Sequence, residues 1–118
     1  MIKKIPFMDL RISNTFEKEM LLNSFQRLMH HGQYIMGQEV DNFEKKFATY
    51  CNRKYCIGVS SGTDAIFIAL KCLGIGSGDE VVTTSLSWIA TANAIAMTGA
   101  NPVFCDIDDD LNINVDSL

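Results

Sequence analysis

The stretch Val59-Ser60-Ser61-Gly62-Thr63-Asp64 links two apolar segments and decides the fold. Residues 55–59 before it are mostly β-branched, aromatic or small, which predicts a short buried strand. Ser61, Thr63 and Asp64 are suitable N-caps for a helix that begins at about Asp64 and continues through the apolar run 65–70. Backbone N–H groups and a helix dipole would then meet at one point that suits a phosphate. An ordinary capped helix on a parallel sheet fits the same pattern.

The composition indicates a chain with enough hydrophobic residues to form a core and no cluster of basic residues. The 118 residues are enough for one compact domain or a piece of a larger one, and 47% of them are hydrophobic. The net charge is -4 and the lysines and arginines are scattered, which argues against nucleic-acid binding. Residues 81–105 lack charge, but Gly99, Pro102 and several polar residues interrupt them. We therefore expect no membrane span.

Neither the cysteines nor the acidic tail has the spacing of a metal site. The four cysteines, at positions 51, 56, 72 and 105, form no C-x-x-C pair, which favours reduced thiols and a cytoplasmic protein. Residues 106–110 are rich in Asp, but a calcium loop would need Gly and an acid where Leu111 and Ser117 stand. We expect no metal ion and interpret the tail as a solvated loop.

The first half of the chain predicts an extended segment and two helices. Residues 3–13 contain spaced apolar positions, and a capping box at Asn14 begins a helix that Gly32 ends after about His31. A second amphipathic helix is expected over 39–50. The apolar residues that it should bury are Val40, Phe43, Phe47 and Tyr50.

The second half predicts alternating strands and helices. A strand over 80–84 is followed by a helix over about 88–98, which we expect residues 85–87 to cap, and then by a strand over 103–105. With the strand at 55–59, this β-α-β-α-β order predicts an α/β fold with a parallel sheet. Ligands of such sheets bind at the carboxyl ends of the strands, where residues 61–63 and 85–88 lie.

A resemblance to a known family is carried by five runs, at 37–44, 61–65, 74–81, 87–93 and 99–108. In this order they resemble the N-terminal part of the DegT/DnrJ/EryC1/StrS family. That family comprises pyridoxal-phosphate-dependent sugar aminotransferases of the aspartate-aminotransferase fold (fold type I). The resemblance implies two parts: an N-terminal extended segment with a helix at 1–36, and the start of the cofactor-binding large domain at 37–118.

The resemblance also implies a cofactor, pyridoxal 5'-phosphate, and residues that bind it. Gly62, Thr63 and Asp64 occupy the positions whose backbone amides, with the Thr hydroxyl, hold the cofactor phosphate. Trp88 occupies the position of an aromatic ring that stacks on the pyridine ring. The alternative for Trp88 is a core residue at a helix start, although a Trp between hydroxyl residues at a strand end fits a platform better.

The family transfers an amino group, usually from glutamate, to a nucleotide-linked keto-sugar, and its active sites lie between the subunits of a homodimer. The match covers only the first third of the family. The lysine that forms the Schiff base would lie beyond residue 118, so we expect no catalytic residue in this chain and no activity from it alone. Two alternatives remain open: a sugar dehydratase with the same cofactor, and a non-catalytic half-domain.

Overall fold

The computed structural model describes residues 5–118, so Lys3 and Lys4 of the expected extended segment lie outside the described residues. The chain divides into two compact units, Met1–Ile57 and Gly58–Leu118, which are described separately. In the described part of the chain, no helix is both long and apolar enough to span a membrane.

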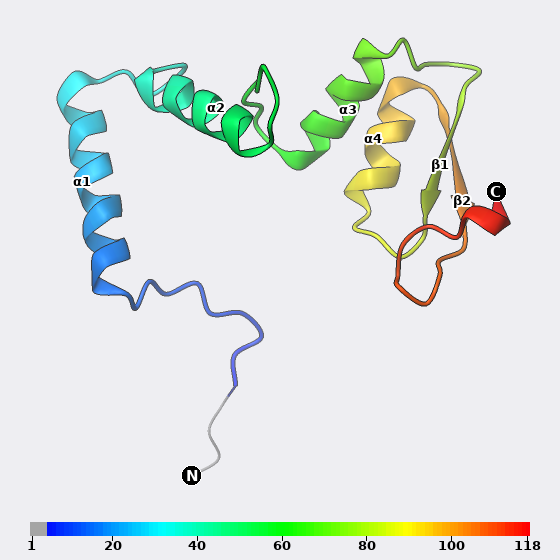
Figure 1. Ribbon diagram of the computed structural model, residues 1–118, viewed down its shortest axis with the longest axis horizontal. Coiled ribbons are helices and arrows are strands. Elements are labelled where there is room, and N and C mark those ends of the chain that lie inside the picture. The colour runs from blue at the N-terminus through cyan, green and yellow to red at the C-terminus, as the bar shows by residue number, and fades with distance from the viewer. Residues whose placement is uncertain (1–4) are drawn as a thin grey trace. The chain divides into compact units, whose positions relative to one another are not determined.

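Helix α1 (Thr15–His31) lies where the sequence predicts it (Figure 1). Asn14 is its N-cap, and its side chain accepts a hydrogen bond from the N–H of Glu17 at 3.1 Å. Gly32 ends the helix in the left-handed region with φ of 70°, a conformation that glycine adopts without steric cost. Both ends of α1 therefore follow from local chemistry.

Helix α2 (Gln38–Tyr50) is also confirmed, but the predicted burial of its apolar face is wrong. Val40 is half-buried, whereas Phe43 and Phe47 are exposed and Tyr50 is 86% exposed. The centroid of the Phe47 ring lies 5.4 Å from that of Phe43 and 6.1 Å from that of Tyr50. Among the described residues, α2 shares no extended interface with another helix or strand.

The predicted strand at 55–59 is wrong, because these residues form no ladder. Tyr55 is 73% exposed and Ile57 is 80% exposed. A strand requires a partner that supplies hydrogen bonds, and among residues 5–118 the strands β1 (Glu80–Thr84) and β2 (Asn101–Cys105) pair only with each other.

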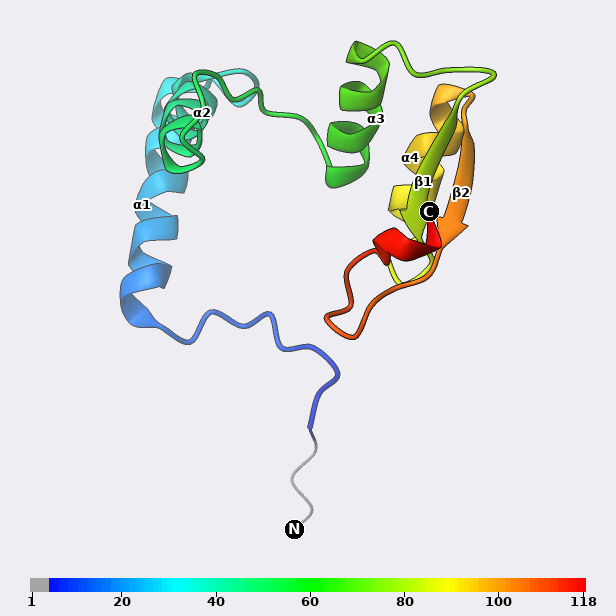
Figure 2. The same ribbon diagram turned by 45° about the vertical axis from the view of Figure 1, so that its right-hand side comes forward.

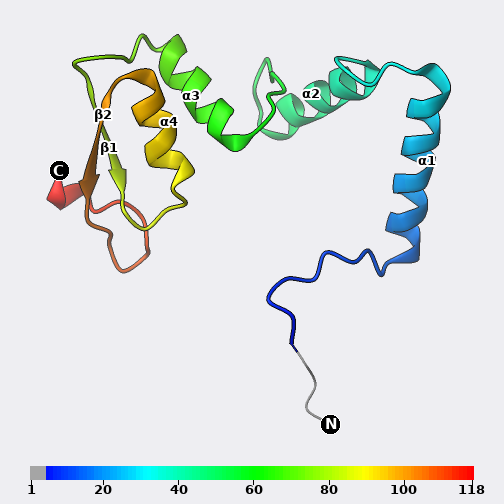
Figure 3. The same ribbon diagram turned by 180° about the vertical axis from the view of Figure 1, so that it is seen from behind.

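The second unit is a parallel βαβ unit with one further helix beside it (Figures 1, 2 and 3). β1 and β2 are in register from Glu80 opposite Asn101 to Thr84 opposite Cys105. Helix α4 (Ala90–Thr98) connects them and packs on the sheet, and helix α3 (Gly62–Cys72) packs on α4. The α/β class and the parallel sheet are therefore confirmed.

The core of this unit lies between α4 and its neighbours. Ala94 is fully buried and Ile95 is 2% exposed, and burial of an Ile side chain contributes about 1.5–3 kcal/mol. The hydroxyl of Thr98 donates to the carbonyl of Ile95 at 2.7 Å and accepts the N–H of Ala100 at 3.2 Å. This hydroxyl therefore satisfies two buried backbone groups where α4 turns into β2.

Two predicted boundaries shift. α4 begins at Ala90 with Ile89 as a cap that offers no side-chain hydrogen bond, so the expected capping by residues 85–87 is wrong. β2 begins at Asn101 rather than at 103. Pro102 fits there because each strand of a two-stranded sheet has an edge on which no N–H is needed.

The acidic tail forms a loop that is held by hydrogen bonds between its own side chains. Asn114 Nδ2 donates to Asp108 Oδ1 and Asn112 Nδ2 donates to Asp110 Oδ2, both at 3.0 Å. The loop leads into a single 3₁₀ turn over Val115–Ser117. No group of three or more His, Cys, Asp or Glu side chains within residues 5–118 could hold a metal ion.

Candidate cofactor-binding site

The N-terminus of α3 is held by a serine cap. Ser61 has extended backbone angles, φ of -158° and ψ of 164°, and its Oγ accepts the N–H of Asp64 at 3.1 Å. The carbonyl of Ser61 accepts the N–H of Ala65 at 3.0 Å, which closes the first helical turn. This geometry agrees with the cap that the sequence predicts.

The cap uses one amide of the predicted phosphate site and leaves two others available. The N–H of Asp64 already bonds Ser61, whereas the N–H groups of Gly62 and Thr63 have no acceptor among residues 5–118. The hydroxyl of the half-buried Thr63 has no partner there either. The two amides, with the helix dipole behind them, form the part of the turn that can bind an anion.

The side chain of Asp64 is engaged by the two serines before it. Its Oδ2 accepts the hydroxyl of Ser60 and, at 3.0 Å, the hydroxyl of Ser61. Donation from Ser60, and then from Ser61, lowers the pKa of Asp64 below its usual value of 3.8. Asp64 is therefore ionised at neutral pH, and its charge is stabilised within the cap.

Gly62 leaves open space beside these amides. A Cβ placed on Gly62 would meet no atom within 4 Å, and its backbone angles do not require glycine. A group with the size and charge of a phosphate can therefore approach the backbone closely. Free amides, an adjacent hydroxyl and this space are what a phosphate-bearing cofactor requires at this position.

Trp88 stands at the carboxyl end of β1 and is 79% exposed, so it is not a core residue of this unit. It lines a cavity of about 130 Å³ together with Phe104 from β2. The cavity thus joins apolar rings to a polar wall, and an exposed indole there can stack on a planar aromatic ring. The hydroxyl side chains of that wall are Thr84, Ser85, Ser87 and Thr91.

Both candidate features lie at the same end of the second unit. The N-termini of α3 and α4 and the carboxyl ends of β1 and β2 all point to that end in each view (Figures 1, 2 and 3). Gly62, Thr63 and Asp64 lie on the first of these elements, and Trp88 precedes the second. Such an edge is where parallel α/β sheets bind ligands.

Lys71 lies at the other end of α3 and is engaged elsewhere. Its Nζ donates to the carbonyl of Thr98 at 3.0 Å, in a half-buried contact between the last turns of α3 and α4. A positive charge is favourable there because it faces the negative end of the α4 dipole. The contact gives Lys71 a packing role remote from Gly62.

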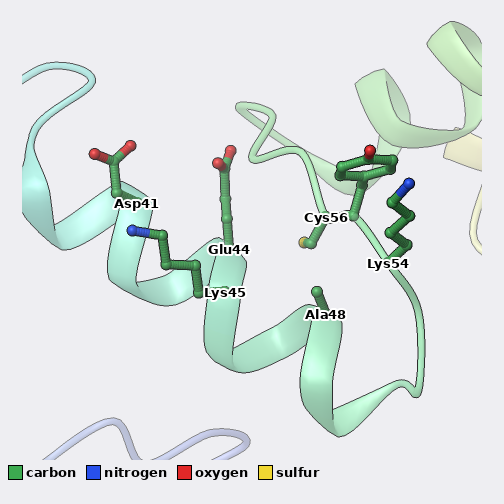
Figure 4. Close-up of a pocket in the computed structure, with 7 residues that line it drawn as sticks. Asp41, Glu44, Lys45, Ala48, Lys54 and Cys56 are labelled. Carbon is green, nitrogen blue, oxygen red and sulfur yellow. The ribbon is translucent and has the colours of Figure 1, made fainter.

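The first unit has a separate cavity of about 180 Å³ between α2 and residues 54–56 (Figure 4). Its lining combines acidic and basic side chains with the buried Ala48 and with Cys56. Lys54 Nζ lies 5.0 Å from the centroid of the Tyr55 ring, a cation–π contact. The residues that line this cavity include none of the site residues predicted from the sequence.

Sequence reasoning missed two other residues that line the Trp88 cavity. Phe104 and Thr91 are 16 and 3 residues from Trp88 along the chain, and only the register and the helix turn bring them to the same cavity. The strand register could have indicated Phe104, because this residue lies one position before the carboxyl end of β2, where the cavity lies.

Comparison with known proteins gives a consistent picture. The sequence model of the DegT/DnrJ/EryC1/StrS aminotransferase family matches residues 15–118. The chain is 44% identical over 115 residues to dTDP-3-amino-3,6-dideoxy-alpha-D-galactopyranose transaminase of Aneurinibacillus thermoaerophilus. That alignment covers 97% of this chain and 31% of the relative. The chain therefore spans about a third of the length of this curated relative.

Solved structures show the same fold. A DegT DnrJ EryC1 StrS aminotransferase from Brucella abortus matches with a TM-score of 0.88 and 37% identity, over 96% of this chain and 31% of that one. NtdA from Bacillus subtilis, with bound cofactor PMP, matches with a TM-score of 0.84 and 38% identity, over 92% of this chain and 25% of that one. The α/β arrangement is thus that of part of these aminotransferases.

Proposed function

Because the chain belongs to the DegT/DnrJ/EryC1/StrS aminotransferase family, we propose that it is the N-terminal part of a pyridoxal-phosphate-dependent aminotransferase that converts a nucleotide-linked keto-sugar to an amino-sugar. One observation carries the proposal. Two free amides at the start of α3 and the exposed ring of Trp88 stand at the same end of the second unit. A phosphorylated aromatic cofactor has complementary groups for both.

In this proposal the amides of Gly62 and Thr63, with the Thr63 hydroxyl, bind the cofactor phosphate. Asp64 contributes through the cap: its carboxylate and N–H hold Ser61, which fixes the direction of the two free amides. Trp88 supplies one face for the cofactor ring. When bound, pyridoxal phosphate supplies the electron sink for amino transfer, and these residues supply grip and orientation.

The proposed substrates follow the relatives. The relative from Aneurinibacillus is a transaminase named for a dTDP-linked amino-sugar. We propose a nucleotide-linked keto-sugar as acceptor and glutamate as amino donor. The sugar, the reacting carbon and the nucleotide are left open, because the Trp88 cavity favours an aromatic ring without distinguishing among sugars.

We also propose that the intact protein is a cytoplasmic homodimer, with residues 1–36 as an N-terminal segment and 37–118 as the start of the large domain. The motivation is helix α3, whose extended contact among the described elements is with α4 and whose Ile68 is 44% exposed, which leaves apolar surface for a partner subunit. Static light scattering at micromolar concentration should give the dimer mass, and a monomer would contradict this proposal.

The test of the function is an amino-transfer assay on the protein at the length of its relatives. It would contain pyridoxal phosphate, glutamate and a dTDP- or UDP-linked 3-keto-sugar, with products identified by mass spectrometry. We expect the amino-sugar and 2-oxoglutarate, with strong loss of both in Gly62→Val. A dehydrated sugar without 2-oxoglutarate would indicate the dehydratase instead. Failure to bind the cofactor at all would indicate a non-catalytic half-domain.

A further inference from the structure

Trp88 is flanked by two hydrogen bonds that converge on Thr91. The N–H of Thr91 donates to the carbonyl of Trp88 at 3.0 Å. The Thr91 hydroxyl lies 2.9 Å from the hydroxyl of Ser87, the residue immediately before Trp88, and either oxygen can be the donor. Thr91, in the first turn of α4, thus bonds the carbonyl of Trp88 through its backbone and the side chain of Ser87 through its hydroxyl.

The surrounding turn has little else to hold it. Ile89 caps α4 without a side-chain hydrogen bond, and the remaining side-chain contact in the turn is from the N–H of Leu86 to Thr84 Oγ1 at 3.0 Å. Packing does not immobilise Trp88 either, because its ring is largely exposed. The position of the ring therefore depends on the backbone from which it projects.

We propose that Ser87 and Thr91 are positioning residues for Trp88, and that their hydroxyl pair sets the spacing between the Trp88 ring and Phe104 across the cavity. This inference rests on the proposed function, because it takes the pyridine ring of pyridoxal phosphate as the ligand that uses the spacing. Both hydroxyl residues line the same cavity as the two rings. Loss of either hydroxyl removes one polar group from the lining, keeps both rings in it and releases the turn.

The alternative role of the Ser87–Thr91 hydroxyl pair is to stabilise the start of α4, where Ile89 offers no side-chain hydrogen bond. A cap stabilises α4 without affecting how Trp88 meets a ligand, whereas a positioning pair changes both the freedom of the ring and cofactor affinity. The two roles are separated by a signal from Trp88 itself. Trp88 is the only tryptophan in these 118 residues, and subtraction of a Trp88→Phe variant isolates its emission in a protein of any length.

The experiment titrates pyridoxal phosphate into the intact protein and into Ser87→Ala, Thr91→Val and Thr91→Ser variants, and records quenching and anisotropy of the Trp88 emission. Removal of one hydrogen bond should weaken cofactor binding by about two- to tenfold in Ser87→Ala and Thr91→Val. Anisotropy before cofactor addition should fall in the same two variants. Thr91→Ser keeps the hydroxyl and should restore both readings.

Thr49→Val is the matched control. It removes a hydroxyl that donates to the carbonyl of Lys45 at 2.9 Å on α2, with the same change of side chain. We expect no effect on Trp88 anisotropy or cofactor affinity, while the circular dichroism melt reports any loss of helix stability.

The outcomes distinguish this inference from the function on which it rests. Absence of quenching in the unmodified protein would overturn the role of Trp88 in the proposed function, and this inference with it. Quenching in the unmodified protein with unchanged affinity and anisotropy in Ser87→Ala would overturn the inference alone. Because Ser87 is exposed and lies outside α4, this variant stays informative even where Thr91→Val unfolds.

Discussion

Ser61 and Asp64 bond each other twice: Ser61 Oγ accepts the N–H of Asp64 at 3.1 Å and donates to Asp64 Oδ2 at 3.0 Å. This reciprocal pair fixes the first turn of α3 and uses the third amide of the turn. The amides of Gly62 and Thr63 are thereby left as the available donors. The cap therefore determines which amides are available to the proposed phosphate site.

Acid should weaken the start of α3. The pKa of Asp64 is lowered by the hydroxyls of Ser60 and Ser61, so its contribution to stability is present above its unfolded value near 3.8 and is lost as the pH falls through the lower folded value. Ser60→Ala removes the hydrogen bond that lowers the pKa of Asp64 most, so this pKa should rise toward 3.8. Carboxyl carbon shifts measured by NMR against pH would show this.

Asp110 is the control for that titration. Its pKa is lowered by the side chain of Asn112, which Ser60→Ala leaves intact. The Asp110 titration should therefore be the same in both proteins. An Asp64 midpoint unmoved by Ser60→Ala would show that the Ser60 hydroxyl does not stabilise the carboxylate.

Substitutions at Gly62 and Gly74 should have opposite consequences. Gly62 has ordinary backbone angles and open space around it, so Gly62→Ala should leave the free energy of unfolding unchanged or slightly higher and still weaken cofactor binding. Gly74 has φ of 82°, so Gly74→Ala should lower stability by about 1 kcal/mol without a direct effect on the cofactor. Urea unfolding and cofactor titration separate the two effects. If Gly62→Ala and Gly62→Val both bound the cofactor as tightly as the unmodified protein, the close approach of the phosphate to the backbone at Gly62 would be refuted.

The cap of α1 provides a prediction independent of the cofactor. Asn14→Ala removes the acceptor for the N–H of Glu17 and should destabilise the helix by about 1 kcal/mol. Asn14→Ser keeps a capping oxygen and should recover most of that loss. Helical circular dichroism at increasing temperature gives both values, and equal melts for Ala and Ser would contradict the capping role.

The features that the sequence predicts best are those with local causes. Asn14 and Gly32 set the ends of α1, because caps and left-handed residues act within a few positions of the chain. The local chemistry of the turn predicted either an anion site or an ordinary capped helix, and the resemblance to the family assigned the phosphate to Gly62, Thr63 and Asp64. Their role in cofactor binding remains a prediction.

The errors have non-local causes. Residues 55–59 have the composition of a strand, but strand formation depends on a distant partner, and β1 and β2 pair with each other instead. The burial predicted for Phe47 and Tyr50 failed for the same reason: an apolar stripe shows which face a helix would bury and says nothing of what covers it. Ser87 was interpreted as part of a cap because composition does not reveal its pairing with Thr91.

The most direct measurement of the central claim is an amide NMR titration of isotopically labelled protein with pyridoxal phosphate and, separately, with pyridoxal. The amides of Gly62 and Thr63 should shift strongly with pyridoxal phosphate and little with pyridoxal, because only the first carries the phosphate that they are proposed to bind. The indole N–H of Trp88 should respond to both, because both carry the ring. Shifts at Gly62 and Thr63 that are absent, or equal for the two compounds, would contradict the account.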